Sequence, residues 1–161
     1  MNLSLSGRIA LITGASSGFG AHFARLFVRE GARVVIGARR VDRITALAEE
    51  LGDAALAVAM DVTNEASIIA AYDAAEAKFG VVDTVVANAG VSADGRSTEV
   101  TAADVAGLVA TNFTGAYITA REGAKRMIAI IRSAIRAVVK AAAHRGIDSD
   151  AALDQDLRGI G

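Results

Sequence analysis

Short apolar runs alternate with longer stretches of helical periodicity along the first 90 residues of the chain. The short runs are rich in Val, Ile and Ala and have the length of buried strands, whereas the longer stretches have the length and spacing of helices. The predicted strands cover residues 8–13, 33–37, 55–60 and 82–87, and the predicted helices cover residues 18–30, 41–51 and 64–79. Gly31, Gly52 and Gly80 stand where these helices end, as C-cap glycines do. Four strands separated by three helices predict a parallel sheet with right-handed crossovers.

The composition suits a single α/β domain with an aliphatic core. Of the 161 residues, 53% are hydrophobic and only 4% are aromatic, which is typical of a parallel sheet covered by helices on both faces. The net charge of −1 offers no general attraction to nucleic acid or to an anionic membrane. The chain has no cysteine, no signal-peptide pattern in its first residues and no apolar run long enough to span a membrane. We therefore expect a cytoplasmic protein that binds neither nucleic acid nor membranes.

The first predicted strand runs directly into a glycine-rich turn at residues 13–20, which precedes the first predicted helix. Gly14, Gly18 and Gly20 would let the backbone turn tightly, approach a pyrophosphate closely and pack the helix against the sheet. The free N–H groups at the helix N-terminus would then face the anion. The turn also contains the candidate ligands Ser16, Ser17 and Phe19. A turn that binds nothing is the alternative, because glycine-rich turns are common.

In this context the turn resembles the T-G-x-x-x-G-x-G motif of the short-chain dehydrogenase/reductase family. A second apolar strand follows the helix, as a dinucleotide-binding βαβ unit requires. The resemblance covers about residues 5–128. It implies a Rossmann-like doubly wound parallel sheet with strand order 3-2-1-4. It also implies a nicotinamide dinucleotide cofactor and hydride transfer to or from an unidentified small carbonyl or alcohol substrate.

Two arginines, Arg39 and Arg40, follow the second predicted strand. An acidic residue here would hydrogen-bond the adenosine ribose, whereas arginine can hold a 2′-phosphate. The positive charge therefore favours NADP, with NAD as the second cofactor. A charge-assisted hydrogen bond contributes about 1.5–3 kcal/mol, which corresponds to tenfold to hundredfold selectivity. The alternative is that both arginines are solvated residues at the start of the next helix.

Asp61 and Val62 follow the third predicted strand. In the family, an aspartate at this place contacts the adenine amino group, so the resemblance makes both residues candidates for cofactor binding. Taken alone, an aspartate after a strand is more often a helix N-cap. Thr63 and Asn64 could also serve as caps.

The fourth predicted strand runs into Asn88, Ala89 and Gly90, which resemble the family's N-A-G motif. In the family this motif braces the central sheet and lines the cofactor crevice. A helix is predicted over residues 101–109, and Asn112 follows it. Asn112 matches the asparagine of the family's catalytic set, which bends the helix and holds a water in the proton relay. The alternative is an ordinary polar residue near a helix junction.

The resemblance ends near Ile128. The family continues with a strand that carries a catalytic serine and a helix that carries Tyr-x-x-x-Lys. This chain has two tyrosines: Tyr72 is followed four residues later by Glu76, and Tyr117 by Arg121. Carbonyl reduction needs a positioned proton donor, and the loss of general acid catalysis costs about 10² to 10⁴ in rate. We therefore expect a truncated form that binds cofactor but is catalytically impaired.

The sequence after Ile128 keeps helical spacing, with Ile131 and Ile135 on an apolar face and Arg132 and Arg136 beside it. No breaker separates this stretch from the helix that begins near residue 113, so a single helix of roughly 33 residues is predicted. A short helix is predicted over residues 147–157. The predicted division is a dinucleotide-binding domain at residues 1–127 and a helical tail at residues 128–161.

Two classes of function follow from these features. The first is an oxidoreductase of the short-chain family, and the second is a non-catalytic interaction protein that uses its long amphipathic helix. A sheet that ends at the fourth strand would expose an edge and favour association into a homo-oligomer. His22 and His144 are isolated in the sequence, so no metal site is expected.

Overall fold

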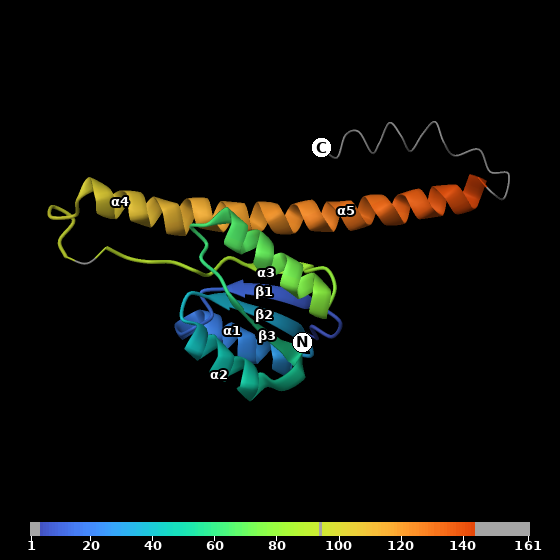
Figure 1. Ribbon diagram of the computed structural model, residues 1–161, viewed down its shortest axis with the longest axis horizontal. Coiled ribbons are helices and arrows are strands. Elements are labelled where there is room, and N and C mark those ends of the chain that lie inside the picture. The colour runs from blue at the N-terminus through green and yellow to red at the C-terminus, as the bar shows by residue number, and fades with distance from the viewer. Residues whose placement is uncertain (1–3, 94, 144–161) are drawn as a thin grey trace. The chain divides into compact units, whose positions relative to one another are not determined.

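The computed structural model describes residues 4–93 and 95–143, in which four strands form one parallel sheet (Figure 1). The strands are β1 (Ile9–Thr13), β2 (Arg33–Ala38), β3 (Ala55–Ala59) and β4 (Thr84–Val86). Their order in the sheet is β3-β2-β1-β4, and every pairing is parallel. The predicted doubly wound sheet and its strand order are therefore confirmed. The switch in direction of winding lies at β1, between β2 and β4.

The helices follow the predicted pattern closely. They are α1 (Gly18–Arg29), α2 (Val41–Leu51), α3 (Glu65–Lys78), α4 (Ala102–Leu108) and α5 (Ala116–Ala143), with a 3₁₀ turn at Gly52–Ala54. The fourth strand is shorter than the predicted 82–87, because β4 pairs with β1 only over three positions, from Ala10 opposite Thr84 to Ile12 opposite Val86. The sheet is thus anchored on this side by a short ladder.

Alternating residues of the strands belong to two separate hydrophobic cores, one on each face of the sheet. In β1, Ala10 and Ile12 pack in the cluster that includes α1 and α2, whereas Ile9 and Leu11 pack in the cluster that includes α3. Figure 1 shows α1 and α2 on one face and α3 on the other. Period-two alternation in strands that are apolar on both faces produces this layering.

A π-helical segment at Val109–Gly115 joins α4 to α5, so the chain is helical without interruption from α4 to the end of α5. The single long helix predicted from residue 113 onward is present as far as Ala143. At Gly115 a Cβ atom would lie 2.8 Å from Cγ2 of Val62, so the absence of a side chain lets this helix approach the turn after β3. The π segment is a local distortion that periodicity does not reveal.

Contacts between residues divide the chain into two units, residues 1–124 and residues 125–161. The described part of the second unit is the C-terminal portion of α5. The boundary predicted after residue 127 stays a prediction, and the short helix predicted over 147–157 lies outside the described residues. Within residues 4–93 and 95–143, no helix has both the length and the apolar character that crossing a membrane requires.

Tyr72 on α3 is completely buried and joins α3 to the beginning of α5. Its hydroxyl donates a hydrogen bond to the carbonyl oxygen of Thr119 at 2.8 Å, and the Thr119 hydroxyl donates to the carbonyl oxygen of Gly115 at 2.7 Å. A Cβ atom on Gly123 would lie 2.7 Å from the Tyr72 hydroxyl oxygen. The side chain of this tyrosine is therefore part of the packing of the helices.

We predict that Tyr72→Phe lowers the free energy of unfolding by about 1–2 kcal/mol, because the Thr119 carbonyl loses a buried donor. Urea unfolding followed by circular dichroism measures the change. Tyr117→Phe is the matched control, since Tyr117 is 61% exposed and should change stability by less than about 0.5 kcal/mol. Equal effects of the two substitutions would contradict this interpretation of Tyr72.

Candidate functional site

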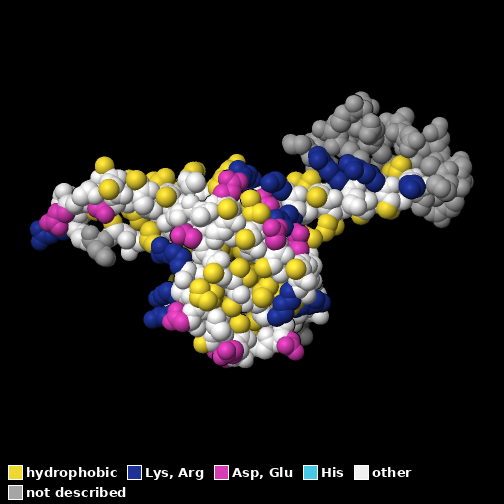
Figure 2. Space-filling model, viewed as in Figure 1, with side chains coloured by type: hydrophobic (Ala, Val, Ile, Leu, Met, Phe, Trp, Pro, Cys, Tyr) yellow, Lys and Arg dark blue, Asp and Glu magenta, His cyan; other side chains and the backbone are white. Residues whose placement is uncertain are grey.

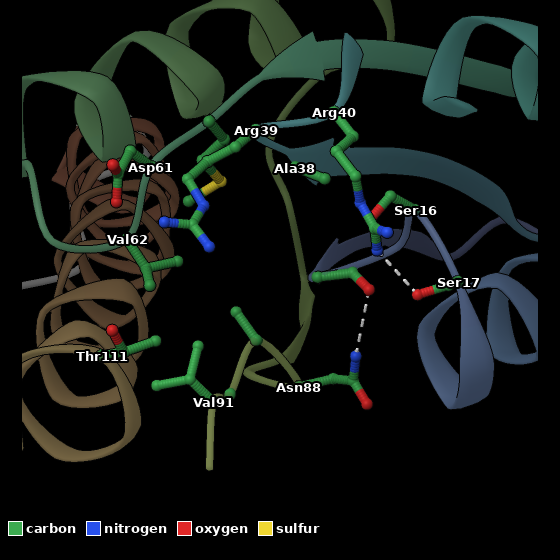
Figure 3. Close-up of a pocket in the computed structure, with 14 residues that line it drawn as sticks. Ser16, Ser17, Ala38, Arg39, Arg40, Asp61, Val62, Asn88, Val91 and Thr111 are labelled. Carbon is green, nitrogen blue, oxygen red and sulfur yellow. Dashed lines mark hydrogen bonds between the residues drawn. The ribbon is translucent and has the colours of Figure 1, made fainter. Parts of the chain in front are cut away.

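A cleft of about 470 Å³ opens at the carboxyl ends of all four strands (Figure 3). It is lined by Gly14, Ser16, Ser17, Ala38, Arg39, Arg40, Met60, Asp61, Val62, Asn88, Ala89, Gly90, Val91 and Thr111. Its position is the switch point of the doubly wound sheet, where ligands bind in this class of fold. Its volume lies within the range of about 300–1,000 Å³ typical of small-molecule sites. Among the predicted site residues, Gly18, Phe19, Gly20 and Asn112 do not line the cleft.

The glycines of the turn after β1 meet different spatial requirements. Gly14 has φ +67°, and a Cβ atom there would lie 2.7 Å from Cα of Ala89, so the turn passes directly against the segment after β4. A Cβ atom on Gly20 would lie 2.6 Å from the carbonyl oxygen of Gly14. Gly18 has φ +56° but no neighbouring atom within 4 Å of a Cβ position. The turn is therefore packed at Gly14 and Gly20 and open at Gly18.

Helix α1 begins at this open position without a side-chain cap. Ser17 is its N-cap residue, and the Ser17 side chain makes no capping hydrogen bond. The first N–H groups of an α-helix have no partner within the helix, and they carry the positive end of its dipole. The backbone of Gly18 and Phe19 thus presents donors suited to an anion. The Phe19 side chain is 76% exposed and stacks on Phe23 at 6.2 Å, so only its backbone serves this turn.

Thr13 is the first residue of the T-G-x-x-x-G-x-G motif, but the sequence assigned it no role of its own, and in the structure it holds the ends of β1 and β4 together. Its buried Oγ1 accepts hydrogen bonds from the backbone N–H groups of Asn88 at 3.0 Å and Ala89 at 2.9 Å. The Asn88 side-chain amide donates back to the Thr13 carbonyl oxygen at 2.9 Å. In the sequence, Thr13 is a polar residue at the end of an otherwise apolar strand, and this position could have indicated a buried hydrogen-bonding role.

The two arginines after β2 lie differently. Arg40 extends to the glycine turn, where its guanidinium donates to Oγ of Ser16 and Oγ of Ser17 (Figure 3). Arg39 extends into the cleft on the side of Asp61 (Figure 3). On the face in Figure 2, acidic side chains are interspersed with basic ones over the sheet domain. The positive charge at the cleft is therefore a local feature in a chain of net charge −1.

Asp61 accepts hydrogen bonds within the turn after β3 and is not the N-cap of α3. Its Oδ1 accepts hydrogen bonds from the backbone N–H of Thr63 at 2.9 Å and from the Thr63 hydroxyl at 2.7 Å. These bonds, with the positive charge of Arg39 in addition, hold the pKa of Asp61 below its ordinary value. Asn64 is the N-cap of α3 and accepts from the Ser67 N–H at 3.2 Å. The N-cap alternative for Asp61 is thus excluded, and Asp61, with its lowered pKa, is one of the residues that line the cleft.

Asn112 lies in the π-helical segment, and its side chain makes two hydrogen bonds to the backbone of Val91. Its Oδ1 accepts from the Val91 N–H and its Nδ2 donates to the Val91 carbonyl oxygen, both at 2.8 Å. Val91 and Thr111 line the cleft, whereas Asn112 is not among the residues that line it. The side chain of Asn112 therefore fixes one wall of the cleft, and its part in a proton relay stays a prediction. Within residues 4–93 and 95–143, no cluster of His, Asp or Glu could hold a metal ion.

Comparison with known proteins agrees with this geometry. The sequence profile of the short chain dehydrogenase family matches residues 8–150. Momilactone A synthase from Oryza sativa subsp. japonica is 42% identical over 134 residues, which cover 81% of this chain and 49% of that protein. Sorbitol dehydrogenase from Cereibacter sphaeroides is 38% identical over 127 residues, which cover 79% of this chain and 50% of that protein.

A solved structure resembles the fold directly. The 3-ketoacyl-(acyl-carrier-protein) reductase from Brucella melitensis, in a crystal structure complexed with NADH, matches with a TM-score of 0.75 and 42% identity over 78% of this chain and 52% of that chain. The fold and the cleft define a doubly wound α/β domain of the nucleotide-binding type. The chain belongs to the short-chain dehydrogenase family. It spans about half the length of the curated relatives it matches, and the profile match runs past Ile128 to residue 150.

We predict that Gly14→Ala lowers the free energy of unfolding by about 2–4 kcal/mol, because the backbone at residue 14 has a positive φ that disfavours a side chain and the new Cβ would meet the Ala89 backbone. Gly107→Ala on α4 is the control, since a Cβ there has open space and should stabilise the helix by about 0.5–1 kcal/mol. Urea unfolding of both variants measures the difference. A Gly14→Ala protein as stable as the wild type would show that the turn does not pack on β4.

The hydrogen bonds from Thr63 predict how Asp61 affects stability at low pH. A depressed pKa in the folded state contributes stability above the ordinary pKa, and this contribution is lost as pH falls below about 4. Thr63→Val should raise the pKa of Asp61 and so reduce this acid-induced loss. Carboxyl NMR titration measures the pKa, with the exposed Thr45→Val as control. A pKa of Asp61 unchanged in Thr63→Val would refute the assignment.

Proposed function

We propose that the cleft binds a nicotinamide dinucleotide. The observation that carries the proposal is the uncapped N-terminus of α1, which lies at the open position of Gly18 beside the two serine hydroxyls. In this arrangement the pyrophosphate would bind at the glycine turn. The adenosine ribose would lie at Arg39 and the adenine at Asp61 and Val62. Asn88, Ala89 and Gly90 would form the floor of the cleft.

The proposed cofactor is NADP in preference to NAD. Arg39 supports this preference, since it places a positive charge at the end of β2 where an acidic residue would otherwise bind the ribose 2′-hydroxyl. Arg40 adds a second positive charge nearby. The solved relative from Brucella melitensis is complexed with NADH, so NAD is the natural competitor in a binding experiment.

The proposed chemistry is that of the family, hydride transfer between the cofactor and a small carbonyl or alcohol. A bound nicotinamide ring would supply or accept the hydride. The reaction also needs a proton donor for the developing alkoxide. In this chain, the Tyr72 hydroxyl is buried against Thr119, and Tyr117 has Arg121 rather than Lys four residues later. We therefore propose that these 161 residues bind cofactor and catalyse poorly on their own.

A second candidate function is protein interaction through the long helix. Ile130, Ile131 and Val138 on α5 are 48%, 54% and 68% exposed, which favours a partner for this part of the helix. Such a function requires neither the glycine turn nor Arg39. Cofactor binding therefore separates the two candidates.

The test is a calorimetric titration of the wild-type chain and of Arg39→Ala with NADPH and with NADH. We expect the wild type to bind NADPH more tightly, by about tenfold to hundredfold, because a guanidinium–phosphate bond is charge-assisted. Arg39→Ala should lose this advantage and keep its affinity for NADH.

Arg29→Ala is the control, since Arg29 is an exposed cation at the far end of α1. It should leave both affinities unchanged. The same samples, mixed with NADPH and small carbonyl compounds, should oxidise NADPH no faster than buffer. The absence of binding at millimolar NADPH and NADH would contradict the proposed function, and rapid turnover would contradict the proposed catalytic impairment.

A further inference from the structure

Arg39 and Arg40 are neighbours in the sequence but have different partners. The Arg40 guanidinium makes three hydrogen bonds to the glycine turn: Nε to Ser16 Oγ at 3.1 Å, Nη2 to Ser16 Oγ at 2.8 Å and Nη2 to Ser17 Oγ at 2.8 Å. Among the described residues no hydrogen bond of Arg39 is found, and Figure 3 shows its guanidinium in the cleft. One arginine is thus engaged by the protein, and the other is available to a ligand.

The direction of the hydrogen bonds determines what the two serines can still do. A guanidinium only donates, so Ser16 and Ser17 accept from Arg40 and each keeps its own O–H to donate elsewhere. A hydroxyl that accepts from a cation becomes a stronger donor through polarisation. The N–H groups at the start of α1 are donors at the same turn. An anion is the ligand that this set of donors fits.

Arg40 also connects two crossover turns of the fold. It is the N-cap residue of α2, so its backbone is fixed at the β2–α2 junction, while its side chain reaches the β1–α1 turn. A backbone hydrogen bond from the Ala15 N–H to the Gly37 carbonyl oxygen, at 3.3 Å, connects the same two turns. For Arg40 to bind a 2′-phosphate, it would have to release both serines. Arg39 needs no such rearrangement.

We propose that Arg40 is a positioning residue that orients the Ser16 and Ser17 hydroxyls toward the pyrophosphate of either cofactor. Arg39 alone then distinguishes NADP from NAD. This inference rests on the proposed function and divides the roles of two residues within it. It predicts that the two arginines affect different quantities, since Arg40 sets the affinity for any pyrophosphate ligand and Arg39 sets the ratio of the two affinities.

The test is calorimetric titration of Arg40→Ala with NADPH, NADH and ADP, which carries a pyrophosphate but no 2′-phosphate. All three affinities should fall by the same factor, about fivefold to thirtyfold, since the loss concerns orientation of neutral donors. The ratio of NADPH to NADH affinity should remain that of the wild type. Arg39→Ala should instead change this ratio and leave ADP binding unchanged.

A double-mutant cycle shows whether Arg40 acts through the serines. In a protein that carries Ser16→Ala and Ser17→Ala, the further substitution Arg40→Ala should change affinity less than twofold, because its partners are already absent. The serine double variant alone should weaken NADPH and NADH equally. The serine double variant leaves Arg40 unchanged, so it tests the proposal even where Arg40→Ala fails to fold, and urea unfolding of each variant establishes that the fold is retained.

The possible results distinguish failure of the proposed Arg40 role from failure of the proposed cofactor binding. If the wild type binds neither cofactor, both the proposed function and this inference are wrong. If the wild type binds and Arg40→Ala weakens NADPH alone, Arg40 contacts the 2′-phosphate and only the inference is overturned. Full additivity of Arg40→Ala and the serine substitutions would likewise overturn it.

Discussion

The buried hydroxyl of Thr13 is the interaction on which the site depends. It accepts the N–H groups of Asn88 and Ala89 at a point where β1 and β4 share a ladder of only three residue pairs. The same junction brings the Gly14 backbone so close to Ala89 that no side chain fits. Because α1 starts from the turn after Gly14, the contact between β1 and β4 determines the position and direction of the α1 N-terminus. Loss of the brace would move the turn, the helix end and the cleft together.

Hydrogen bonds from neighbouring side chains hold three parts of the cleft wall in place. Arg40 holds the glycine turn, Thr63 holds Asp61, and Asn112 holds Val91. The bonds of Arg40 and Asn112 join segments that are distant in the sequence, whereas the bond of Thr63 is local to the turn after β3, and all three fix the cleft wall with the protein's own groups. A preorganised site binds its ligand with less loss of conformational entropy. All described residues that line the cleft lie between Gly14 and Thr111, so the cleft is formed within the part of the chain that matches its relatives.

The sequence predicted the sheet and its helices because apolar runs and helical periodicity are local signals. The strand order came from the family resemblance, and the structure confirms it. Features that depend on distant contacts were not predicted. The Thr13 brace joins residues 75 positions apart, and Val91, the partner of Asn112, lies 21 positions away in a loop without periodicity. The different directions of Arg39 and Arg40 depend on side-chain rotamers, which two adjacent identical residues cannot reveal.

The central claim is that a nicotinamide dinucleotide binds with its pyrophosphate at the start of α1. Backbone amide NMR of the labelled chain during addition of NADPH tests it most directly, because each amide reports its own surroundings. We predict that the largest shifts fall on Gly18, Phe19 and Gly20, with smaller shifts at Asp61 and Val91. Shifts confined to other parts of the chain, or no shifts at saturating NADPH, would contradict it.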